Sequence, residues 1–386
     1  MRSGPRIAVD ARPAVTRDKT GIGYYAWHLL RLLPEVDPAS TYVAWYLNPY
    51  AALGARRFFE PRPNFRERRT PIPASWFERS AARFDLPRVE WLVGFDVFFA
   101  PNFLPPPTRA RRLVLTVHDM AFKRFPQTAP HATRQWLQRM DDVLPRATRI
   151  IAVSEATKRD LVELSHVQPE RVVVIPLGID TDRFHPATQD AVDRARRRFG
   201  IDGPYLLYLG GIEPRKNLPR LLAAFAGLDA DVRPTLVLAG GWVAWNPEGI
   251  DATREALARL PEQVRSRVVM TGYVTDPDKV ALLSGATALV YPSLYEGFGL
   301  PVLEAMACRT PVLTSDVAAL PEVAGDAALL VEPTDVEAIG AGMDRLLRDE
   351  SLRRRLVTAG NARVGAFRWE DAAGRTAEVL RDAARA

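Results

Sequence analysis

Short apolar and β-branched runs alternate with longer segments of helical periodicity along the whole chain. This alternation is typical of βαβ units, in which helices flank a parallel sheet. In the first half the expected strands are residues 7–10, 42–47, 97–100, 113–117, 150–153 and 172–175. In the second half they are residues 205–209, 235–239, 268–270, 288–291, 312–314 and 328–331. The pattern predicts an α/β protein with two doubly wound, Rossmann-like parallel-sheet domains.

The boundary between the two domains is expected where the periodicity lapses and charge concentrates, around the basic run 194–198. Two domains also fit a chain of 386 residues, which exceeds the usual size of a single hydrophobic core. The expected division is an N-terminal domain at 1–183, a linker at 184–203, a C-terminal domain at 204–366 and a final segment at 367–386. Ligands of open α/β sheets lie beyond the carboxyl ends of the strands, so a cleft between the domains is expected to hold the chemistry.

The composition narrows the class of protein. Hydrophobic residues make up 47% and charged residues 25% of the chain, which excludes disordered, fibrous and repeat-array proteins. The single cysteine excludes a disulfide framework and favours a reducing compartment. The sequence shows no signal peptide, and its apolar stretch 91–100 is too short to span a bilayer, so we expect a cytoplasmic protein. The net charge of +6 leaves several kinds of anionic partner open.

Two loops of the first half follow predicted strands. Gly21 and Gly23 stand at the start of a long helix, where glycines let backbone N–H groups approach an anion. The alternative is a tight turn without a ligand. Dinucleotide-binding dehydrogenases carry the motif Gly-x-Gly-x-x-Gly at this point, and Ala26 stands where its third glycine would be, which weakens the case for such an enzyme. His118 follows the strand 113–117, and no other histidine has the spacing to complete a metal site with it.

The loops of the second half carry more chemistry. Arg215 and Lys216 follow a strand and a glycine pair, an arrangement suited to gripping a diphosphate unless the loop is a solvated turn. Further along, Glu296 opens the segment Glu-Gly-Phe-Gly-Leu-Pro, and Glu304 follows within the next helix. Carboxylates bind vicinal hydroxyls well. Glu304 is also explained by compensation of the helix dipole, but that explanation does not cover Glu296.

Two Asp-x-Asp triplets, at 180–182 and 276–278, resemble pairs that hold a divalent cation in some sugar-transfer enzymes. The first lies near the domain boundary, and the second lies at an expected helix N-cap, where aspartate is favoured for backbone reasons. We interpret both as structural and expect no metal site.

Taken together, the chain resembles the retaining glycosyltransferase family 4, of GT-B fold, over essentially its whole length. The resemblance rests on Glu296-x7-Glu304, the loop 210–217 and the segments 153–155, 176–180 and 367–369. It implies two Rossmann-like domains that face a cleft and a final helix that crosses back to the N-terminal domain. It also implies a nucleotide-sugar donor, transfer with retention of configuration, and no metal requirement.

The resemblance further implies a role for each candidate residue. Arg215 and Lys216 would bind the donor diphosphate, Glu296 the donor sugar and Glu304 the ribose, and His118 would reach the sugar from the N-terminal domain. The expected catalytic set is therefore His118, Arg215, Lys216 and Glu296. The further donor-binding positions are Gly21 and Gly23 near the phosphate, Val274 beside the base, and the backbone amides of Phe298, Gly299 and Leu300 around the sugar and phosphate.

The donor and acceptor follow from a narrower likeness. The segments 10–12, 20–24 and 118–119 look like those of bacterial mannosyltransferases that build polysaccharides, so the expected donor is GDP-mannose and the expected acceptor is a glycan or lipid-linked saccharide. Donors such as UDP-glucose or dTDP-rhamnose remain open, as does a non-catalytic sugar-nucleotide-binding protein. No nucleic-acid-binding motif is present, so we expect no nucleic-acid partner.

Cations and aromatic residues alternate repeatedly in the first half of the chain. The segments are 56–59, 66–69, 76–79, 83–84 and 109–112. Cations attract anionic head groups and aromatic rings settle at the membrane interface, so one interpretation is peripheral contact with the inner face of the plasma membrane. The other is a solvated basic face with ordinary core aromatics, and the sequence leaves both open.

Overall fold

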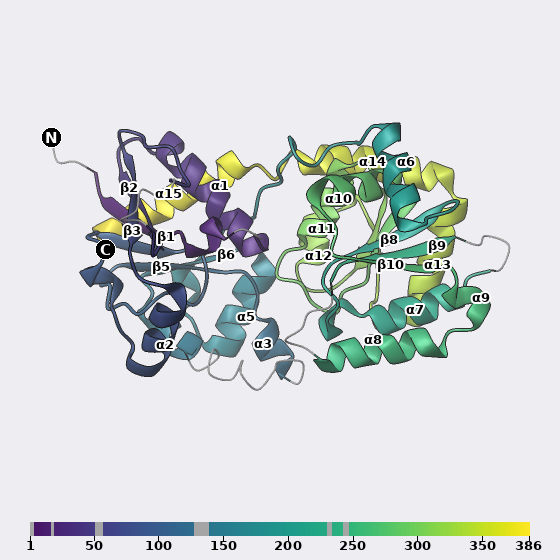
Figure 1. Cartoon of the computed structure of the whole chain (residues 1–386), viewed down its shortest axis with the longest axis horizontal. Coiled ribbons are helices and arrows are strands. Elements are labelled where there is room, and N and C mark those ends of the chain that lie inside the picture. Colours follow the sequence, from purple (N-terminus) through teal and green to yellow (C-terminus); the bar gives the residue numbers. More distant parts are fainter. Residues whose placement is uncertain (1–3, 17–18, 51–56, 127–138, 230–233, 242–246) are drawn as a thin grey trace. The chain divides into compact units, whose positions relative to one another are not determined.

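The computed structural model describes residues 4–16, 19–50, 57–126, 139–229, 234–241 and 247–386, although not the side chains of 247–249. The chain divides into two compact units (Figure 1). Unit 1 comprises Met1–Arg124, Ala132–Gly178 and Arg368–Ala386, and unit 2 comprises Phe125–His131 and Ile179–Phe367. Each unit contains its own parallel sheet, so the predicted fold class is confirmed. The range 184–203, expected to be a linker, belongs to unit 2 and contains helix α6 (Gln189–Phe199).

The sheet of unit 1 has seven parallel strands in the order β3-β2-β1-β4-β5-β6-β7. Their bounds are β1 (Arg6–Asp10), β2 (Thr41–Leu47), β3 (Phe65–Thr70), β4 (Val97–Ala100), β5 (Leu113–Val117), β6 (Arg149–Ala152) and β7 (Val172–Val174). The sequence predicted all of these except β3. That strand reads Phe-Arg-Glu-Arg-Arg-Thr and buries only its two end residues, so it lacks an apolar signal. It lies at the edge of the sheet, where charged side chains discourage pairing with another chain.

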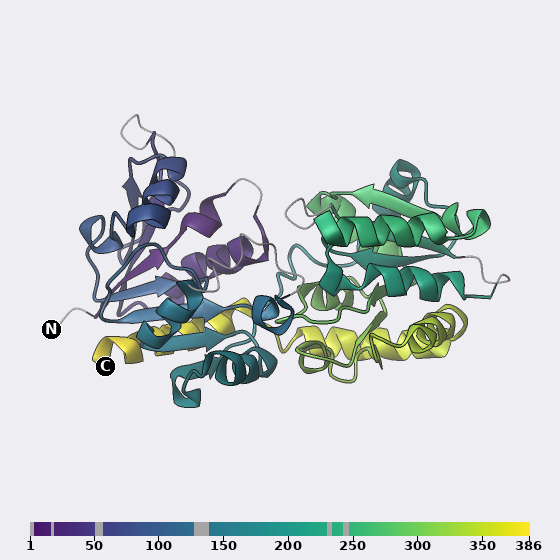
Figure 2. The ribbon, with the colours of Figure 1, turned by 90° about the horizontal axis from the view of Figure 1, so that it is seen from below.

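Helices flank the sheet of unit 1, and the longer ones bury apolar side chains. The helices are α1 (Gly21–Val36), α2 (Ala74–Phe84), α3 (Ala121–Arg124), α5 (Glu155–Ser165) and the C-terminal α15 (Trp369–Arg385). Helix α15 packs against α1 and against strands β4, β5 and β6, and its yellow ribbon lies beside α1 in Figure 1 and beside the sheet in Figure 2. The last segment of the chain is therefore part of the first structural unit.

Unit 2 has a six-stranded parallel sheet in the order β10-β9-β8-β11-β12-β13. The strands are β8 (Tyr205–Leu209), β9 (Thr235–Ala239), β10 (Val268–Gly272), β11 (Ala288–Tyr291), β12 (Val312–Ser315) and β13 (Leu329–Val331). The central strands β8, β9 and β11 are almost completely buried, as expected for a sheet covered on both faces. Their carboxyl ends therefore emerge together at one edge of the unit.

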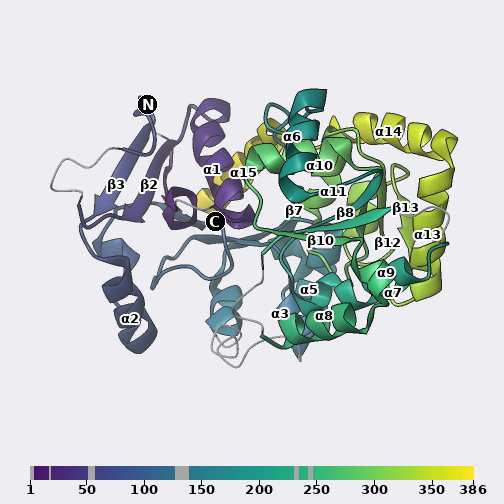
Figure 3. The ribbon, with the colours of Figure 1, turned by 45° about the vertical axis from the view of Figure 1, so that its right-hand side comes forward.

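Helices flank both faces of this second sheet (Figure 3). One layer contains α7 (Leu218–Ala226), α8 (Pro247–Arg259), the short α9 (Glu262–Arg265) and α13 (Val336–Arg348). The other contains α6, α10 (Asp276–Gly285), α11 (Leu300–Ala307) and α14 (Glu350–Val364), and the short α12 (Leu320–Ala324) follows β12. Within the described ranges, every helix falls short of the length and apolar character that a membrane-crossing segment needs.

A buried ion pair attaches α15 to the rest of unit 1. The Nη1 atom of Arg381 lies 2.9 Å from Oδ1 of Asp37, and the Tyr42 hydroxyl donates to Oδ2 of the same carboxylate at 2.8 Å. Asp37 is only 2% exposed. At the start of the helix, a β-carbon on Gly178 would lie 2.4 Å from the backbone nitrogen of Trp369, so the chain needs glycine there. Both ends of α15 are thus fixed to unit 1.

We expect Asp37→Ala to lower the free energy of unfolding by about 2–3 kcal/mol, because it leaves the Tyr42 hydroxyl and the Arg381 guanidinium without their shared acceptor. The matched control is Glu35→Ala. Glu35 also pairs with an arginine, Arg62, but its side chain is 53% exposed, so its loss should cost less than about 1 kcal/mol. Urea denaturation of both variants measures the difference, and equal effects would contradict a structural role for the Asp37 pair.

Candidate active site

Two loops at the carboxyl edge of the unit 2 sheet form the candidate site. The first follows β8 and ends in a 3₁₀ turn at Pro214–Lys216, and the second runs from β11 to the start of α11. The backbone amide of Leu294 donates to the carbonyl of Arg215 at 2.8 Å, which ties the loops together. Asn217, in the left-handed conformation at φ 64°, donates from Nδ2 to the carbonyls of Pro292 at 2.9 Å and Pro333 at 2.6 Å. These bonds fix the positions of the loop side chains.

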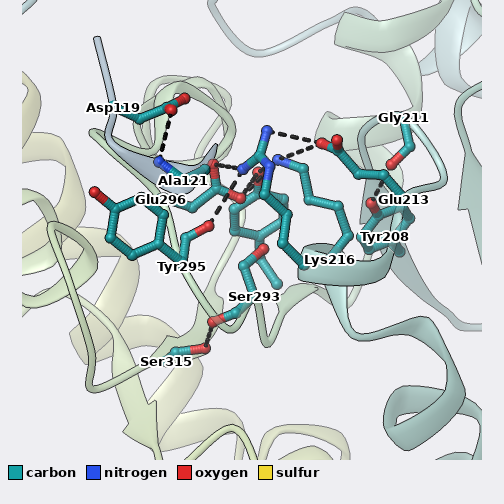
Figure 4. A network of polar contacts seen from close by, with 12 residues as sticks. Asp119, Ala121, Tyr208, Gly211, Glu213, Lys216, Ser293, Tyr295, Glu296 and Ser315 are labelled. Atoms are coloured by element: carbon teal, nitrogen blue, oxygen red, sulfur yellow. Dashed lines mark hydrogen bonds and ion pairs between the residues drawn. The ribbon is translucent and has the colours of Figure 1, made fainter. Parts of the chain in front are cut away.

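The carboxylate of Glu296 is the centre of the polar network in Figure 4. Its Oε2 atom lies 2.7 Å from Nη1 of Arg215, and its Oε1 atom lies 2.6 Å from Nζ of Lys216. Tyr291 completes the arrangement, because its hydroxyl lies 2.8 Å from the same Oε1 and 2.6 Å from Lys216 Nζ. Three residues that the sequence placed in the catalytic set are therefore in direct contact.

Burial makes this pairing strong. Lys216 is 6% and Glu296 is 7% exposed. Burial by itself raises the pKa of Glu296, but Arg215 and Lys216 outweigh that effect and hold the pKa at about 2. Burial and the neighbouring Arg215 lower the pKa of Lys216, and the carboxylates only partly offset them. Glu296 is consequently ionised at neutral pH.

Two members of the network were not predicted from the sequence. Glu213 lies 2.7 Å through Oε1 from Nη2 of Arg215, and Tyr291 bridges Lys216 and Glu296. Both stand in segments that carry the candidate motifs, and Tyr291 is the last residue of its strand, at the edge where sites of this fold class lie. The place of Tyr291 at the end of its strand could have indicated a role in the site. The identity of their partners is visible only in three dimensions.

Glu304 belongs to a separate pair. It projects from α11, is 9% exposed, and its Oε1 atom lies 2.8 Å from Nζ of Lys279 on α10. Lys279 was not among the predicted residues. Val274, expected beside a nucleobase, is 9% exposed and stands between the end of β10 and the start of α10, next to Tyr273, which is 78% exposed.

The start of α11 offers backbone donors. Gly299 is its N-cap at φ 115°, and a β-carbon there would lie 2.8 Å from Cδ2 of Leu320, so only glycine fits. In the described part of the chain, no group accepts a hydrogen bond from the amides of Phe298, Gly299 or Leu300. Unsatisfied amides at a helix N-terminus favour an anionic ligand.

The remaining predicted residues lie in unit 1, at the carboxyl edge of its sheet, and are not part of the Glu296 network. Gly23 donates its amide to the Thr20 hydroxyl at 3.4 Å, and its lack of a side chain lets Pro13 approach. Gly21 begins the same helix, α1. His118 follows β5, with Nε2 at 3.0 Å from the Pro101 carbonyl oxygen. Burial lowers the pKa of His118, so its imidazole is neutral at pH 7.

Both Asp-x-Asp triplets have protein partners. Asp180 accepts a hydrogen bond from the amide of Arg183, whose side chain pairs with Asp276. Asp278 lies 2.8 Å from Nη1 of Arg198 and also accepts from the Thr275 hydroxyl. No cluster of three or more potential metal ligands occurs among the residues with described positions.

Comparison with known proteins identifies the family. Residues 20–183 match the family described as Glycosyltransferase Family 4, and residues 191–363 match Glycosyl transferases group 1. O-antigen chain mannosyltransferase B of Escherichia coli is 34% identical over 288 residues, which are 72% of this chain and 72% of that protein. The chain belongs to glycosyltransferase family 4. It is a glycosyltransferase, and the resemblance stated from the sequence is confirmed.

A further relative and two solved structures agree with this assignment. The MMP alpha-(1->4)-mannosyltransferase of Mycolicibacterium hassiacum is 34% identical over 259 residues, which cover 65% of this chain and 58% of that protein. Alr3699/HepE of Anabaena, solved with UDP and glucose, superposes with a TM-score of 0.72 at 16% identity over 98% of this chain and 100% of that chain. WaaG, a glycosyltransferase involved in lipopolysaccharide biosynthesis, gives a TM-score of 0.67 at 16% identity over 97% of this chain and 99% of that chain. The GT-B fold of the family is thereby confirmed.

We expect Tyr291→Phe to lower sugar transfer by about tenfold, because Lys216 and Glu296 each lose a hydrogen bond that fixes their position. The matched control is Tyr205→Phe. The Tyr205 hydroxyl is equally buried and donates to the Leu282 carbonyl at 2.7 Å, but it lies at the amino end of β8, away from the loops. Both variants should lose about 1–2 kcal/mol of unfolding free energy. Steady-state transfer rates and denaturation curves test this, and equal losses of activity would contradict it.

Proposed function

We propose that this glycosyltransferase moves mannose from GDP-mannose onto a glycan or lipid-linked saccharide, with retention of configuration and without a metal ion. The contact of Glu296 with Arg215 and Lys216 at the start of α11 carries the proposal. It combines two cations with a carboxylate in one buried cluster next to unsatisfied helix amides. Cations and amides suit a diphosphate, and carboxylates suit sugar hydroxyls. The relatives that are mannosyltransferases favour mannose as the transferred sugar.

In this proposal each residue acts on one part of the donor. Arg215 and Lys216 stabilise the negative charge that develops on the departing nucleoside diphosphate, together with the amides of Phe298, Gly299 and Leu300. Glu296 accepts hydrogen bonds from sugar hydroxyls, and Glu304 accepts them from the ribose. Val274 borders the base. Gly21 and Gly23 bring unit 1 backbone to the phosphate, and neutral His118 contacts the sugar.

A same-face reaction accounts for retention. The bond between the anomeric carbon and the phosphate oxygen breaks, the acceptor oxygen bonds to the same face of that carbon, and the acceptor proton passes to the departing phosphate. Glu296 is poorly suited to be a covalent nucleophile, because Arg215, Lys216 and Tyr291 already occupy both of its oxygens. A covalent sugar–enzyme adduct detected by mass spectrometry would contradict this mechanism.

Metal independence is proposed because the acidic triplets have other partners. The carboxylates of Asp276 and Asp278 pair with arginines of unit 2, and that of Asp180 accepts a backbone amide. The cations Arg215 and Lys216 would serve the role that a divalent ion has elsewhere, which is to neutralise the leaving group.

We expect transfer from GDP-mannose to exceed transfer from UDP-glucose and dTDP-rhamnose. Transfer should persist in EDTA, because no metal ion is proposed. It should fall by roughly 100-fold or more in Lys216→Ala, because that variant loses a cation that stabilises the leaving group. Arg198→Ala is the control, because it removes a cation of the same unit whose side chain is 62% exposed. Mass spectrometry of products formed on free and lipid-linked mannosides measures all three effects. A preference for UDP-glucose would select the alternative donor, whereas binding of donor without turnover would contradict the proposed transfer.

The exposed surface of unit 1 supports a second proposal, that the enzyme contacts anionic membrane. Trp76, Phe84 and Trp91 are 51%, 62% and 64% exposed. In contrast, Phe59 and Phe77 of the same cation–aromatic segments are buried, so those rings belong to the core. Arg56 lies outside the described residues.

A cavity of about 590 Å³ lies on the same unit, between the end of α2, the loop 105–109 and the helical segment 139–146. Its charged lining consists of Arg83, Arg109, Arg139, Arg146, Asp85 and Asp142, and exposed Phe84 forms part of its wall. Arginines outnumber carboxylates by four to two in this lining. An anionic head group is the ligand that this charge and the neighbouring rings favour.

We expect the protein to co-sediment with vesicles that contain phosphatidylglycerol, and to bind less in high salt, because exposed cations are screened by ions. Replacing the exposed arginines Arg57, Arg66, Arg83 and Arg111 by glutamine should weaken binding. The control replaces four exposed arginines of unit 2, namely Arg194, Arg197, Arg354 and Arg355, and removes the same net charge. No binding at low salt, or equal losses in both quadruple variants, would contradict a unit 1 docking surface.

A further inference from the structure

The two cations of the donor site are balanced by two carboxylates. Arg215 contacts Glu213 and Glu296 at 2.7 Å each, and Lys216 contacts Glu296 at 2.6 Å and lies 4.0 Å from Glu213. These four side chains are together electrically neutral. A diphosphate has at least two negative charges at neutral pH, so it meets the repulsion of two nearby carboxylates as well as the attraction of the cations.

Glu296 cannot relieve this repulsion by turning away at little cost. Its Oε1 atom is held by Lys216 and by the hydroxyl of Tyr291, which stands on the rigid end of β11, and its Oε2 atom is held by Arg215. Nor is protonation available, because the pKa of about 2 keeps the carboxylate charged throughout the physiological range. The negative charge is therefore a permanent feature of the phosphate-binding loop.

The same carboxylate is suited to a different part of the donor. A carboxylate offers about four acceptor positions, and the protein donors around Glu296 use three of them. A sugar hydroxyl can donate to the fourth. Glu296 then gains a hydrogen bond only from a ligand that still carries its sugar.

We propose that Glu296 makes the site discriminate between the sugar-bearing donor and the nucleoside diphosphate left after transfer. Its charge weakens the binding of the diphosphate, and a hydrogen bond from the sugar offsets that effect only while the sugar is attached. Transfer of the sugar thus removes the compensating contact and promotes release of the product. This inference rests on the proposed function, because it takes the donor to be a sugar joined to a nucleoside diphosphate.

Glu213 provides a matched comparison. Like Glu296 it is a buried carboxylate, 9% exposed, that pairs with Arg215. However, it lies on the β8 loop and no contact joins it to Tyr291 among the described residues. We therefore expect Glu213 to repel the diphosphate as Glu296 does, but not to accept a hydrogen bond from the sugar. Removing Glu213 should strengthen the binding of donor and product alike.

Titration calorimetry on the full chain tests the proposal with inorganic pyrophosphate, GDP and GDP-mannose. Glu296→Gln should bind pyrophosphate and GDP about tenfold more tightly than the wild type, the effect of one charge-assisted contact, whereas its affinity for GDP-mannose relative to GDP should fall. Glu213→Gln should tighten GDP and GDP-mannose to the same extent, so that their ratio is unchanged. Product inhibition by GDP should be stronger in both variants.

Glu296→Asp is the control that keeps the negative charge at this position. It separates the effect of the charge from any structural effect of substituting Glu296. It should bind pyrophosphate as weakly as the wild type does. The proposal that Glu296 discriminates is wrong if Glu296→Gln binds pyrophosphate no more tightly than the wild type. It is also wrong if Glu213→Gln changes the ratio of the affinities for GDP-mannose and GDP as much as Glu296→Gln does. In either case the proposed function stands. A wild-type protein that binds neither pyrophosphate nor any nucleoside diphosphate would overturn the proposed function and this inference together.

Discussion

The carboxylate of Glu296 is the constraint on which the arrangement of the unit 2 loops depends. A buried charge is costly unless it is paired and hydrogen-bonded, and this one has two cations and a tyrosine hydroxyl within 2.8 Å. Satisfying it requires the loop after β8 to meet the loop after β11. The backbone hydrogen bond between Leu294 and Arg215 and the side-chain hydrogen bonds of Asn217 keep the two loops in contact.

The rest of unit 2 serves to place these loops. Parallel strands bring their carboxyl ends to one edge. The order of the sheet puts β8 next to β11, although the last residues of these strands, Leu209 and Tyr291, lie 82 positions apart in the chain. Gly299 allows α11 to start close to Leu320, and the free amides of residues 298–300 follow within four positions of Glu296, which holds the cations. Charge and helix-end dipoles thereby come together at the site where leaving-group charge is proposed to develop.

Much of the fold and part of the site could be predicted from the sequence. The central strands are continuous apolar runs, which gave their positions to within one or two residues, whereas the charged edge strand β3 lacks that signal. Arg215, Lys216 and Glu296 stood out because glycines and a proline surround them at strand ends. Tyr291, Glu213 and Lys279 did not, because a buried tyrosine, a loop glutamate and a helix lysine have ordinary structural explanations.

The sequence by itself determined the class of fold, the membership of the family and the side chains available for chemistry. Those properties depend on local patterns: the apolar period of a strand, the glycine at a tight turn, the cation beside another cation. The tertiary structure decided which charges neutralise one another, and that α15, the last helix, packs in the first unit through Arg381 and Asp37. Such pairings join residues far apart in the chain, and their strength depends on burial, which no local pattern specifies.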